Sequence, residues 1–315
     1  MEKRRKRPFD LLAAGELLID FISTDFADSL DDVHHFKRLM GGSPANMCMN
    51  MSRLGNQTLL ASSVGEDDMG HWVYQQVEQV GVDVRLIAKV TQPTTLILVT
   101  RSKAVSNFEA YRLADCQITA EQFPDEILQQ INLFHTTCFG LSRPPAGDSI
   151  LQAADRAAQH GCQLSIDANY AAKIWPDQQE AQTIVARYCE LGALVKVSEV
   201  DWQRLYGSSL TNAEKAARHF LDLGARQACI TMGGEGVFVA ACDEAGVFLP
   251  ARSVDVKDTT GAGDAFWSGY LTAWLDDHGI RHCAMAGRRM AELKLGHFGP
   301  LPNQVDRQLI YEDFE

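Results

Sequence analysis

Several features that would assign a function at sight are missing from this 315-residue sequence. No apolar run approaches the ~20 residues that a membrane-spanning helix needs, and the N-terminus lacks the apolar core of a secretion signal. The eight cysteines include no C-x-x-C pair, and no Cys/His cluster has zinc-ligand spacing. Most of them have apolar neighbours, as buried thiols do. We therefore expect a cytoplasmic protein with reduced thiols.

Positive charge is also scarce. Lysine and arginine total 29 against 41 aspartates and glutamates, which gives a net charge of -12. Because nucleic-acid phosphates need clustered basic residues, this composition argues against a nucleic-acid partner. The one basic run is Lys3 to Arg7, and nothing continues it. An import signal or a phosphate-binding arm would also fit, but we predict a disordered tail over residues 1–8 and one domain over 9–315.

Two familiar nucleotide fingerprints are absent. The Walker loop G-x-x-x-x-G-K-[ST] does not occur, and the Rossmann pattern G-x-G-x-x-G is incomplete because Phe266 stands where the third glycine belongs after Gly261 and Gly263. The spacing argues against a dinucleotide-dependent dehydrogenase. A phosphate site in this chain would have to be another glycine turn at a helix N-terminus, which the same physics permits.

What the sequence does contain is a regular alternation of helical and apolar strand patterns. Such units predict an α/β fold with a doubly wound, mostly parallel sheet flanked by helices. One buried strand is expected over 9–21. Helices are expected at 44–54, 72–80, 149–160, 177–190, 211–223, 262–276 and 281–295. The segments near 15–40 and 90–115 do not follow the alternation, and we expect them to form a small β lid over the ligand crevice.

The stretch DTTGAGDAFWSGYL, Asp258 to Leu271, places Gly-Ala-Gly at an expected helix start and a carboxylate, Asp264, directly after it. Helix N-termini favour anions because their first N–H groups are unpaired and the helix dipole is positive there. Asp264 is then either a simple helix cap or a base beside an anion bound to the turn.

A second glycine stretch, GGSPANMCMNMSRLG, begins at Gly41. It predicts a helix with Ser43 as its cap and Pro44 in its first turn; alternatively, Asn46 holds a polyhydroxyl ligand. The first apolar segment carries Glu16 and Asp20, which are costly to bury without partners. They are either acceptors for sugar hydroxyls or, for the aspartate, a strand end facing water.

Together these stretches resemble the ribokinase-like (PfkB) carbohydrate kinases, from GELLIDF near the start to GHFGPLP near the end. Within that family the chain is most similar to fructokinases and 2-keto-3-deoxygluconate kinases. The resemblance implies transfer of the γ-phosphoryl group of ATP, with Mg²⁺, to a sugar hydroxyl. Fructose is the favoured acceptor, and 2-keto-3-deoxygluconate or another sugar is the alternative. Relatives often pair through the lid, so a homodimer is expected.

The resemblance also implies roles for individual residues. Asp264 would be the base, beside the backbone N–H groups of the anion turn. The turn is formed by Gly261, Ala262 and Gly263. The sugar would be held by Asp20, Gly41, Gly42, Asn46 and, from the lid side, Arg112, which could also be a solvated strand arginine. ATP would be bound by Ser198, Thr231, Gly233, Gly236, Gly261 and Gly263. Asp201 would lie near Mg²⁺, and Asp258 with Thr260 would match part of a potassium site.

The sequence departs from the family pattern at several positions. Ala171 replaces an arginine that could bind a substrate carboxylate, and Lys173 cannot copy its fork, which argues against an acid sugar. Ser198 and Asp201 replace the usual N-x-x-E, and Arg288 replaces an asparagine near adenine. These changes leave open a sugar-binding regulator that has lost catalysis.

Overall fold

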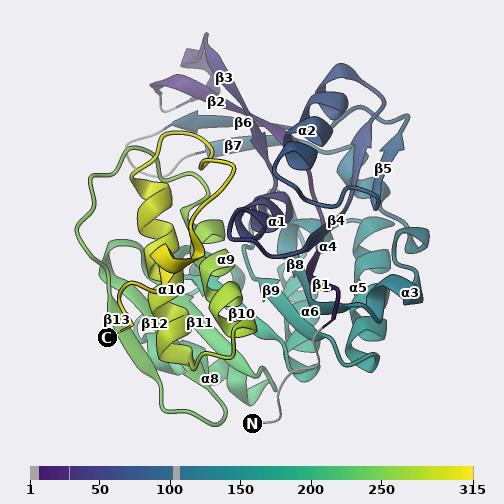
Figure 1. Ribbon diagram of the computed structural model, residues 1–315. Coiled ribbons are helices and arrows are strands. Elements are labelled where there is room, and N and C mark those ends of the chain that lie inside the picture. The colour runs from purple at the N-terminus through teal and green to yellow at the C-terminus, as the bar shows by residue number, and fades with distance from the viewer. Residues whose placement is uncertain (1–6, 28, 102–106, 315) are drawn as a thin grey trace.

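The computed structural model describes residues 7–27, 29–101 and 107–314. Its larger sheet has nine strands in the order β13-β12-β11-β10-β9-β8-β1-β4-β5, and neighbouring strands are parallel except that β12 is antiparallel to both β11 and β13 (Figure 1). The strands are β1 (Phe9–Ala14), β4 (Thr58–Gly65), β5 (Ile87–Val90), β8 (Ile131–Thr137), β9 (Gln163–Asp167), β10 (Leu194–Ser198), β11 (Gln227–Thr231), β12 (Gly236–Ala241) and β13 (Val247–Pro250). The predicted doubly wound, mostly parallel sheet is confirmed.

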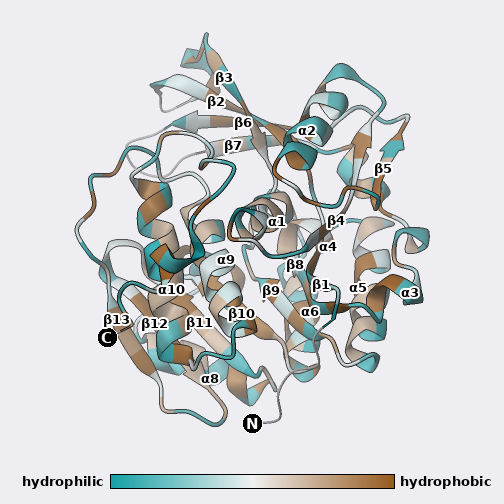
Figure 2. Cartoon of the chain, viewed as in Figure 1, coloured by the Kyte–Doolittle hydropathy of each residue, from teal (hydrophilic) through white to brown (hydrophobic). Residues whose placement is uncertain are grey.

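Helices cover both faces of this sheet because the strand residues are apolar on both sides. In β1, Leu12 and Ala14 pack into the core under α5, α6 and α8, whereas Leu11 and Ala13 pack under α1, α2, α9 and α10. Hydrophilic residues gather in the outer turns (Figure 2). The helices are α1 (Ser43–Arg53), α2 (Asp68–Gln79), α3 (Asp125–Leu128), α4 (Cys138–Leu141), α5 (Ala146–Gln159), α6 (Gln178–Glu190), α7 (Glu199–Tyr206), α8 (Ala213–Asp222), α9 (Ala262–Leu275) and α10 (Ile280–Leu295).

A separate four-stranded sheet stands above α1 at the top of Figure 1. Its strands, in the order β3-β2-β6-β7, are β3 (Phe36–Gly41), β2 (Leu18–Phe26), β6 (Leu96–Arg101) and β7 (Asn107–Tyr111). These are the segments that the sequence set apart from the alternation, so the predicted small sheet is confirmed.

The single strand predicted over 9–21 is wrong in one respect, because it is two strands in two sheets. The chain turns at Gly15, whose φ of 147° is a conformation that side chains disfavour. β1 therefore ends in the large sheet at Ala14, and β2 begins in the small sheet at Leu18. Glu16 lies in the turn between the two sheets, and Asp20 is the third residue of β2.

Helix boundaries follow the predictions closely, with two differences. α2 begins at Asp68 rather than Trp72, because Asp67 caps it by accepting a hydrogen bond of 2.7 Å from the N–H of Gly70. The short helices α4 and α7 were not predicted. All eight cysteines are free thiols. In the part of the chain that the structure describes, no helix is both long and apolar enough to cross a bilayer.

The basic tail predicted over residues 1–8 falls mostly outside the described residues. Arg7 differs from that prediction. Its guanidinium donates to the carbonyl oxygens of Ile131 at 2.8 Å and His160 at 2.6 Å, and to Cys162 Sγ at 3.0 Å. The chain is therefore fixed to the domain one residue before Pro8.

Candidate active site

Asp264 lies in the first turn of α9, and its carboxylate faces the start of another helix. Oδ1 accepts a hydrogen bond of 2.6 Å from the hydroxyl of Ser43, and Oδ2 accepts one of 2.9 Å from Asn46 Nδ2. The N-cap of α9 is Gly261, which has no side-chain cap. Asp264 therefore does not cap its own helix, and that alternative is wrong. Burial raises the pKa of Asp264, and the hydrogen bond from Ser43 opposes the shift.

Ser43 was predicted to cap α1, and it does not. The helix begins at Ser43 itself, and the N-cap position is taken by Gly42. The hydroxyl is thereby free to reach Asp264, while the backbone N–H of Ser43 donates to Glu16 Oε1 at 3.0 Å. A residue that the sequence assigned to local structure thus joins the two glycine stretches.

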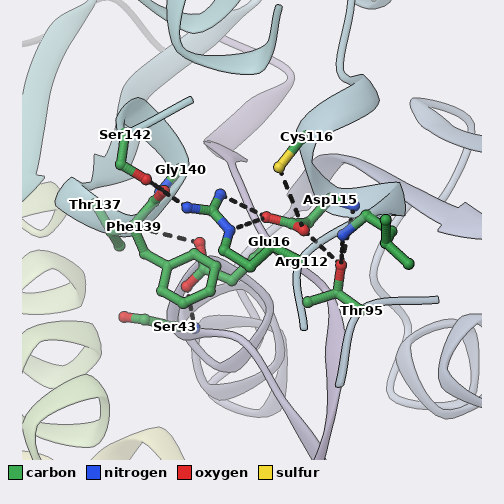
Figure 3. Close-up of polar contacts among 11 residues, drawn as sticks. Glu16, Ser43, Thr95, Arg112, Asp115, Cys116, Thr137, Phe139, Gly140 and Ser142 are labelled. Atoms are coloured by element: carbon green, nitrogen blue, oxygen red, sulfur yellow. Dashed lines mark hydrogen bonds and ion pairs between the residues drawn. The ribbon is translucent and has the colours of Figure 1, made fainter. Parts of the chain in front are cut away.

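Glu16 supports this junction, and each of its two carboxylate oxygens already accepts a hydrogen bond within the chain. Its side chain is 3% exposed, and Oε2 accepts a hydrogen bond of 3.3 Å from the hydroxyl of Thr137 (Figure 3). Burial raises its pKa to about 8, although the N–H of Ser43 and the charge of Arg112 oppose the shift. The expectation that Glu16 accepts sugar hydroxyls is not supported by these contacts.

Asp20, by contrast, lines an open cavity. It lies on β2 beside β3, and a Cβ on Gly41 would come within 2.2 Å of Asp20 Oδ2, so a larger residue there would displace the Asp20 carboxylate. Burial, with a smaller contribution from the charge of Asp264, raises the pKa of Asp20 to about 7. The cavity, of about 220 Å³, is also lined by Asn46 and Gly261. The predicted acceptor residues and anion turn therefore meet at one place.

Arg112 is buried rather than solvated. Its guanidinium donates to Asp115 Oδ2 from Nε at 2.8 Å and from Nη2 at 2.5 Å, and Nη1 donates to the hydroxyl of Ser142. The guanidinium also lies 4.1 Å from the centroid of the Phe139 ring (Figure 3). These contacts tie the end of the small sheet to α4. The alternative of a solvated strand arginine is wrong, and contact with a sugar stays a prediction.

A buried lysine that the sequence reasoning missed lies next to the anion turn. Lys196 Nζ is 2.7 Å from Asp167 Oδ2, and it is 3.5 Å from where a Cβ on Gly263 would be. Burial alone would lower its pKa, but the carboxylates of Asp167 and Asp201 outweigh burial and raise it. The signal was a lone lysine within the apolar run ALVKVS.

Four of the predicted nucleotide residues, Ser198, Thr231, Gly233 and Gly236, lie at or next to the ends of neighbouring strands. Ser198 caps α7 by accepting from the N–H of Asp201 at 3.1 Å, and its hydroxyl donates to Asp201 Oδ2 at 2.5 Å. Thr231 ends β11 beside Ser198. A Cβ on Gly233, in the following turn, would lie 3.7 Å from Glu199 Oε1. Gly236 begins β12. The structure therefore brings these residues together, outside the lining of the cavity.

The predicted potassium residues are engaged within the chain. Asp258 Oδ1 accepts from the N–H of Thr260 at 3.0 Å, and Oδ2 accepts from Lys294 Nζ at 3.2 Å. An ammonium group therefore already faces this carboxylate. Arg288, near the expected adenine region, donates to the carbonyl of Pro250 at 3.2 Å. Across the described residues, no cluster of three or more His, Cys, Asp or Glu side chains could hold a metal ion.

The sequence profile of the pfkB family carbohydrate kinases matches residues 9–306. The chain belongs to the pfkB family of carbohydrate kinases. One pfkB relative is the ATP-dependent 6-phosphofructokinase of Thermoanaerobacterium thermosaccharolyticum. It is 28% identical over 300 residues, which cover 95% of this chain and 92% of that protein.

Solved structures of pfkB kinases agree with this fold. The fructokinase of Halothermothrix orenii is 30% identical, with a TM-score of 0.77 covering 91% of this chain and 98% of the other. An uncharacterised sugar kinase of Pyrococcus horikoshii, solved in complex with ATP, is 26% identical, with a TM-score of 0.79 covering 92% and 93%. The ribokinase-like arrangement of a large sheet and a small separate sheet is thereby shown.

Proposed function

We propose that this pfkB kinase transfers the γ-phosphoryl group of ATP to a hydroxyl of fructose or a fructose derivative, with Asp264 as the base. The observation that carries the proposal is the position of Asp264. Its partly buried carboxylate lies at the N-terminus of α9 and is held by Ser43 and by Asn46, which lines a cavity together with Asp20.

In this proposal, different residues bind the acceptor, take its proton and stabilise the charge of the transferring phosphoryl group. Asp20 and Asn46 hold the acceptor, and Asp264 orients the reacting hydroxyl and takes its proton. The hydroxyl oxygen forms a bond to the γ-phosphorus while the bond from that phosphorus to the bridging oxygen of ADP breaks. The transition state is loose, so positioning and charge stabilisation supply most of the rate enhancement. In this proposal the N–H groups at the start of α9 and the ammonium of Lys196, beside Gly263, stabilise that charge.

The nucleotide side fits ATP with Mg²⁺. Mg²⁺ in kinases takes one or two protein carboxylates together with phosphate oxygens and water. Asp167 Oδ1 is buried without a hydrogen-bond partner among the described residues, and Asp201 has a pKa raised to about 6, chiefly by burial and then by the charge of Asp167. These two carboxylates would hold the ion. When bound, the ion would neutralise phosphate charge.

Fructose is favoured over an acid sugar by the residues near position 171. Lys173, which is the nearest cation to the missing arginine in sequence, lies 2.6 Å from Glu109 Oε1 and donates to the carbonyl of Phe108. It is therefore engaged on β7. The 30% identity to the H. orenii fructokinase supports the same acceptor.

A second acceptor class is a phosphorylated fructose. The T. thermosaccharolyticum relative carries the name ATP-dependent 6-phosphofructokinase and matches nearly the whole chain. The observation that favours this class is a group of basic side chains at the far end of the cavity, among them Arg53.

The Asp264→Asn variant tests the proposed function. We expect kcat to fall by at least about a thousandfold, since the reacting hydroxyl loses its base and its alignment. Binding of ATP, measured by calorimetry, should stay within a few-fold. Asp148→Asn is the matched control, because Asp148 is also an acid in the first turn of a helix but is exposed on α5. Undiminished turnover in Asp264→Asn would remove the base assignment.

A further inference from the structure

The cavity beside Asp264 is longer than the acceptor contacts require. Along α1 it is lined by Asn46, Met49, Asn50 and Arg53. These residues are spaced by three or four positions, so they form one face of the helix. At 1.5 Å per residue, the backbone positions of Asn46 and Arg53 lie about 10 Å apart. The cavity therefore runs from the reacting end of α1 to its last turn.

Arg53, at the far end, is a buried cation with an unfilled hydrogen-bonding position. The residue is 6% exposed. Nη1 donates to Asn50 Oδ1 at 3.0 Å, and Nε has no acceptor within residues 7–27, 29–101 and 107–314. Among the residues that the structure describes, no carboxylate forms an ion pair with it. Burial lowers its pKa to about 10. An arginine in this state lacks the anion that usually accompanies burial.

A purely structural role explains only part of this arrangement. A cation in the last turn of a helix interacts favourably with the helix dipole. That interaction is available to an exposed side chain, however, and does not require burial or an empty donor. The position of Arg53 on the face of α1 that lines the cavity is what points to a ligand.

Two more cations line the same cavity. Arg38, on β3 of the small sheet, lies 4.1 Å from the centroid of the Trp72 ring, and Nη1 lies 3.7 Å from Met69 Sδ. None of its contacts in the described part of the chain is with a carboxylate. Lys294 is 8% exposed, and its Nζ lies 3.2 Å from Asp258 Oδ2. The cavity thus has two arginines without a counter-ion, and its other carboxylate, Asp20, lies at the reacting end.

We propose that the far end of this cavity, formed by Arg53 with Arg38 and Lys294, binds the phosphate group of a phosphorylated sugar whose free hydroxyl faces Asp264. This inference rests on the proposed kinase function and names its acceptor class as a sugar phosphate. A phosphate monoester carries close to two negative charges at neutral pH and offers three acceptor oxygens. It can therefore satisfy both guanidinium groups, whereas a carboxylate carries one charge and two oxygens.

The length of the cavity supports the same class. A six-carbon sugar phosphate with its reacting hydroxyl and its phosphate at opposite ends spans most of the ~10 Å between the two ends of this helix face. A free hexose bound at Asp20 and Asn46 would leave Arg53 without an anion.

Steady-state kinetics with fructose and with fructose 6-phosphate, at saturating ATP and Mg²⁺, tests the inference. For the wild-type protein we expect kcat/KM to be at least about tenfold higher for fructose 6-phosphate. Arg53→Gln should lower that kcat/KM by about 10- to 100-fold, as expected for one lost charge-assisted hydrogen bond, and leave the value for fructose within about twofold. Arg38→Gln, at an exposed position, should act in the same direction by a smaller factor.

Arg226→Gln is the matched control, because it removes one exposed guanidinium at the start of β11, away from the cavity lining. It should change neither value. If fructose is preferred and Arg53→Gln leaves the preference unchanged, the inference is overturned while the kinase function stands. Preference for 2-keto-3-deoxygluconate over fructose 6-phosphate would also overturn it, since the anion would then be a carboxylate.

Calorimetry separates this inference from the proposed function. Fructose 6-phosphate should bind the wild-type protein at least about tenfold more tightly than it binds Arg53→Gln. If no sugar is phosphorylated but this difference persists, the kinase function fails and the phosphate site stands. If Arg53→Gln does not fold, the wild-type preference and the Arg38→Gln measurement decide the question alone.

Discussion

Arg112 and Arg53 are buried to nearly the same extent, with exposures of 5% and 6%, but their surroundings differ. Arg112 donates two hydrogen bonds to Oδ2 of Asp115, and it also has a hydroxyl acceptor and an aromatic ring against its guanidinium. Arg53 has one amide acceptor and an unpartnered Nε. The two arginines therefore differ in their counter-ion rather than in their burial, and Arg53 is the one that we propose binds a ligand.

The reason is the cost of burying charge. A guanidinium taken out of water loses several kcal/mol of hydration, and a well-placed carboxylate returns much of it. Arg112 is compensated within the chain. The hydration free energy that Arg53 loses on burial is not compensated by a carboxylate of the described chain. An anion that enters the cavity would therefore form an ion pair that the free protein lacks. Three measurements test this distinction.

The largest effect is expected for Arg112→Met. Removing one partner of a buried ion pair leaves Asp115 uncompensated, which costs about 3–5 kcal/mol in the free energy of unfolding. Urea denaturation followed by circular dichroism measures this loss. Adding Asp115→Leu to the variant should recover a large part of it, because no buried charge then lacks a partner. A loss below about 1 kcal/mol would mean that the pair contributes little to stability.

A smaller effect of opposite sign is expected for Arg53→Met. A pKa lowered from 12.5 to about 10 corresponds to an upper bound of roughly 3 kcal/mol of burial cost at neutral pH. We expect the free energy of unfolding to stay the same or to rise by no more than that bound, because the lost bond to Asn50 offsets part of the gain. The same urea titration applies. If Arg53→Met loses as much free energy of unfolding as Arg112→Met, then Arg53 also stabilises the fold and the distinction between the two arginines fails.

The smallest effect is expected for Glu16, as a change in the free energy of unfolding with each pH unit. Glu16 lies close enough to Arg112 for the charge of that arginine to lower the pKa of the carboxyl group. Its folded pKa of about 8 exceeds the ordinary 4.5, so the folded state binds more protons and stability falls as pH rises between these values. The contribution is at most about 1.4 kcal/mol per pH unit and ends above the folded pKa. Unfolding free energies at pH 6 and 8 should therefore fall less for Glu16→Gln than for the wild type.

In the Arg112→Met background, the fall attributable to Glu16 should extend to higher pH, since the neighbouring positive charge is gone. Identical pH profiles for the wild type and Glu16→Gln would show that Glu16 is ionised in the folded state. Its two hydrogen bonds would then outweigh its burial.

Much of this could be predicted from sequence because the signals are local. The large sheet follows from alternating apolar patterns, and the place of Asp264 follows from a glycine turn ahead of an apolar helix. The division of residues 9–21 into two strands could not be predicted. The chain turns at Gly15 and passes from the large sheet to the small one, which leaves Glu16 in the turn and Asp20 on β2. The tertiary contacts were also out of reach.

Ser43, Lys196 and Arg53 show why those contacts were missed. The sequence gives Ser43 an ordinary local role as a helix cap, but a partner 221 residues away, Asp264, takes its hydroxyl. The lysine appears as an interruption in an apolar strand, and the arginine as a typical last-turn cation. Their roles depend on which carboxylates the fold places beside them. Ser43 and Lys196 each contact a carboxylate, and Arg53 forms no ion pair with one among the described residues.

The hydrogen bond between Ser43 and Asp264 also has a consequence for biosynthesis. Ser43 is made 221 residues before Asp264, so a ribosome-bound or truncated product that stops before α9 contains α1 without the carboxylate that we propose as the base. Such a fragment lacks the group proposed to align the reacting hydroxyl. We therefore expect a chain that stops before α9 to consume no ATP.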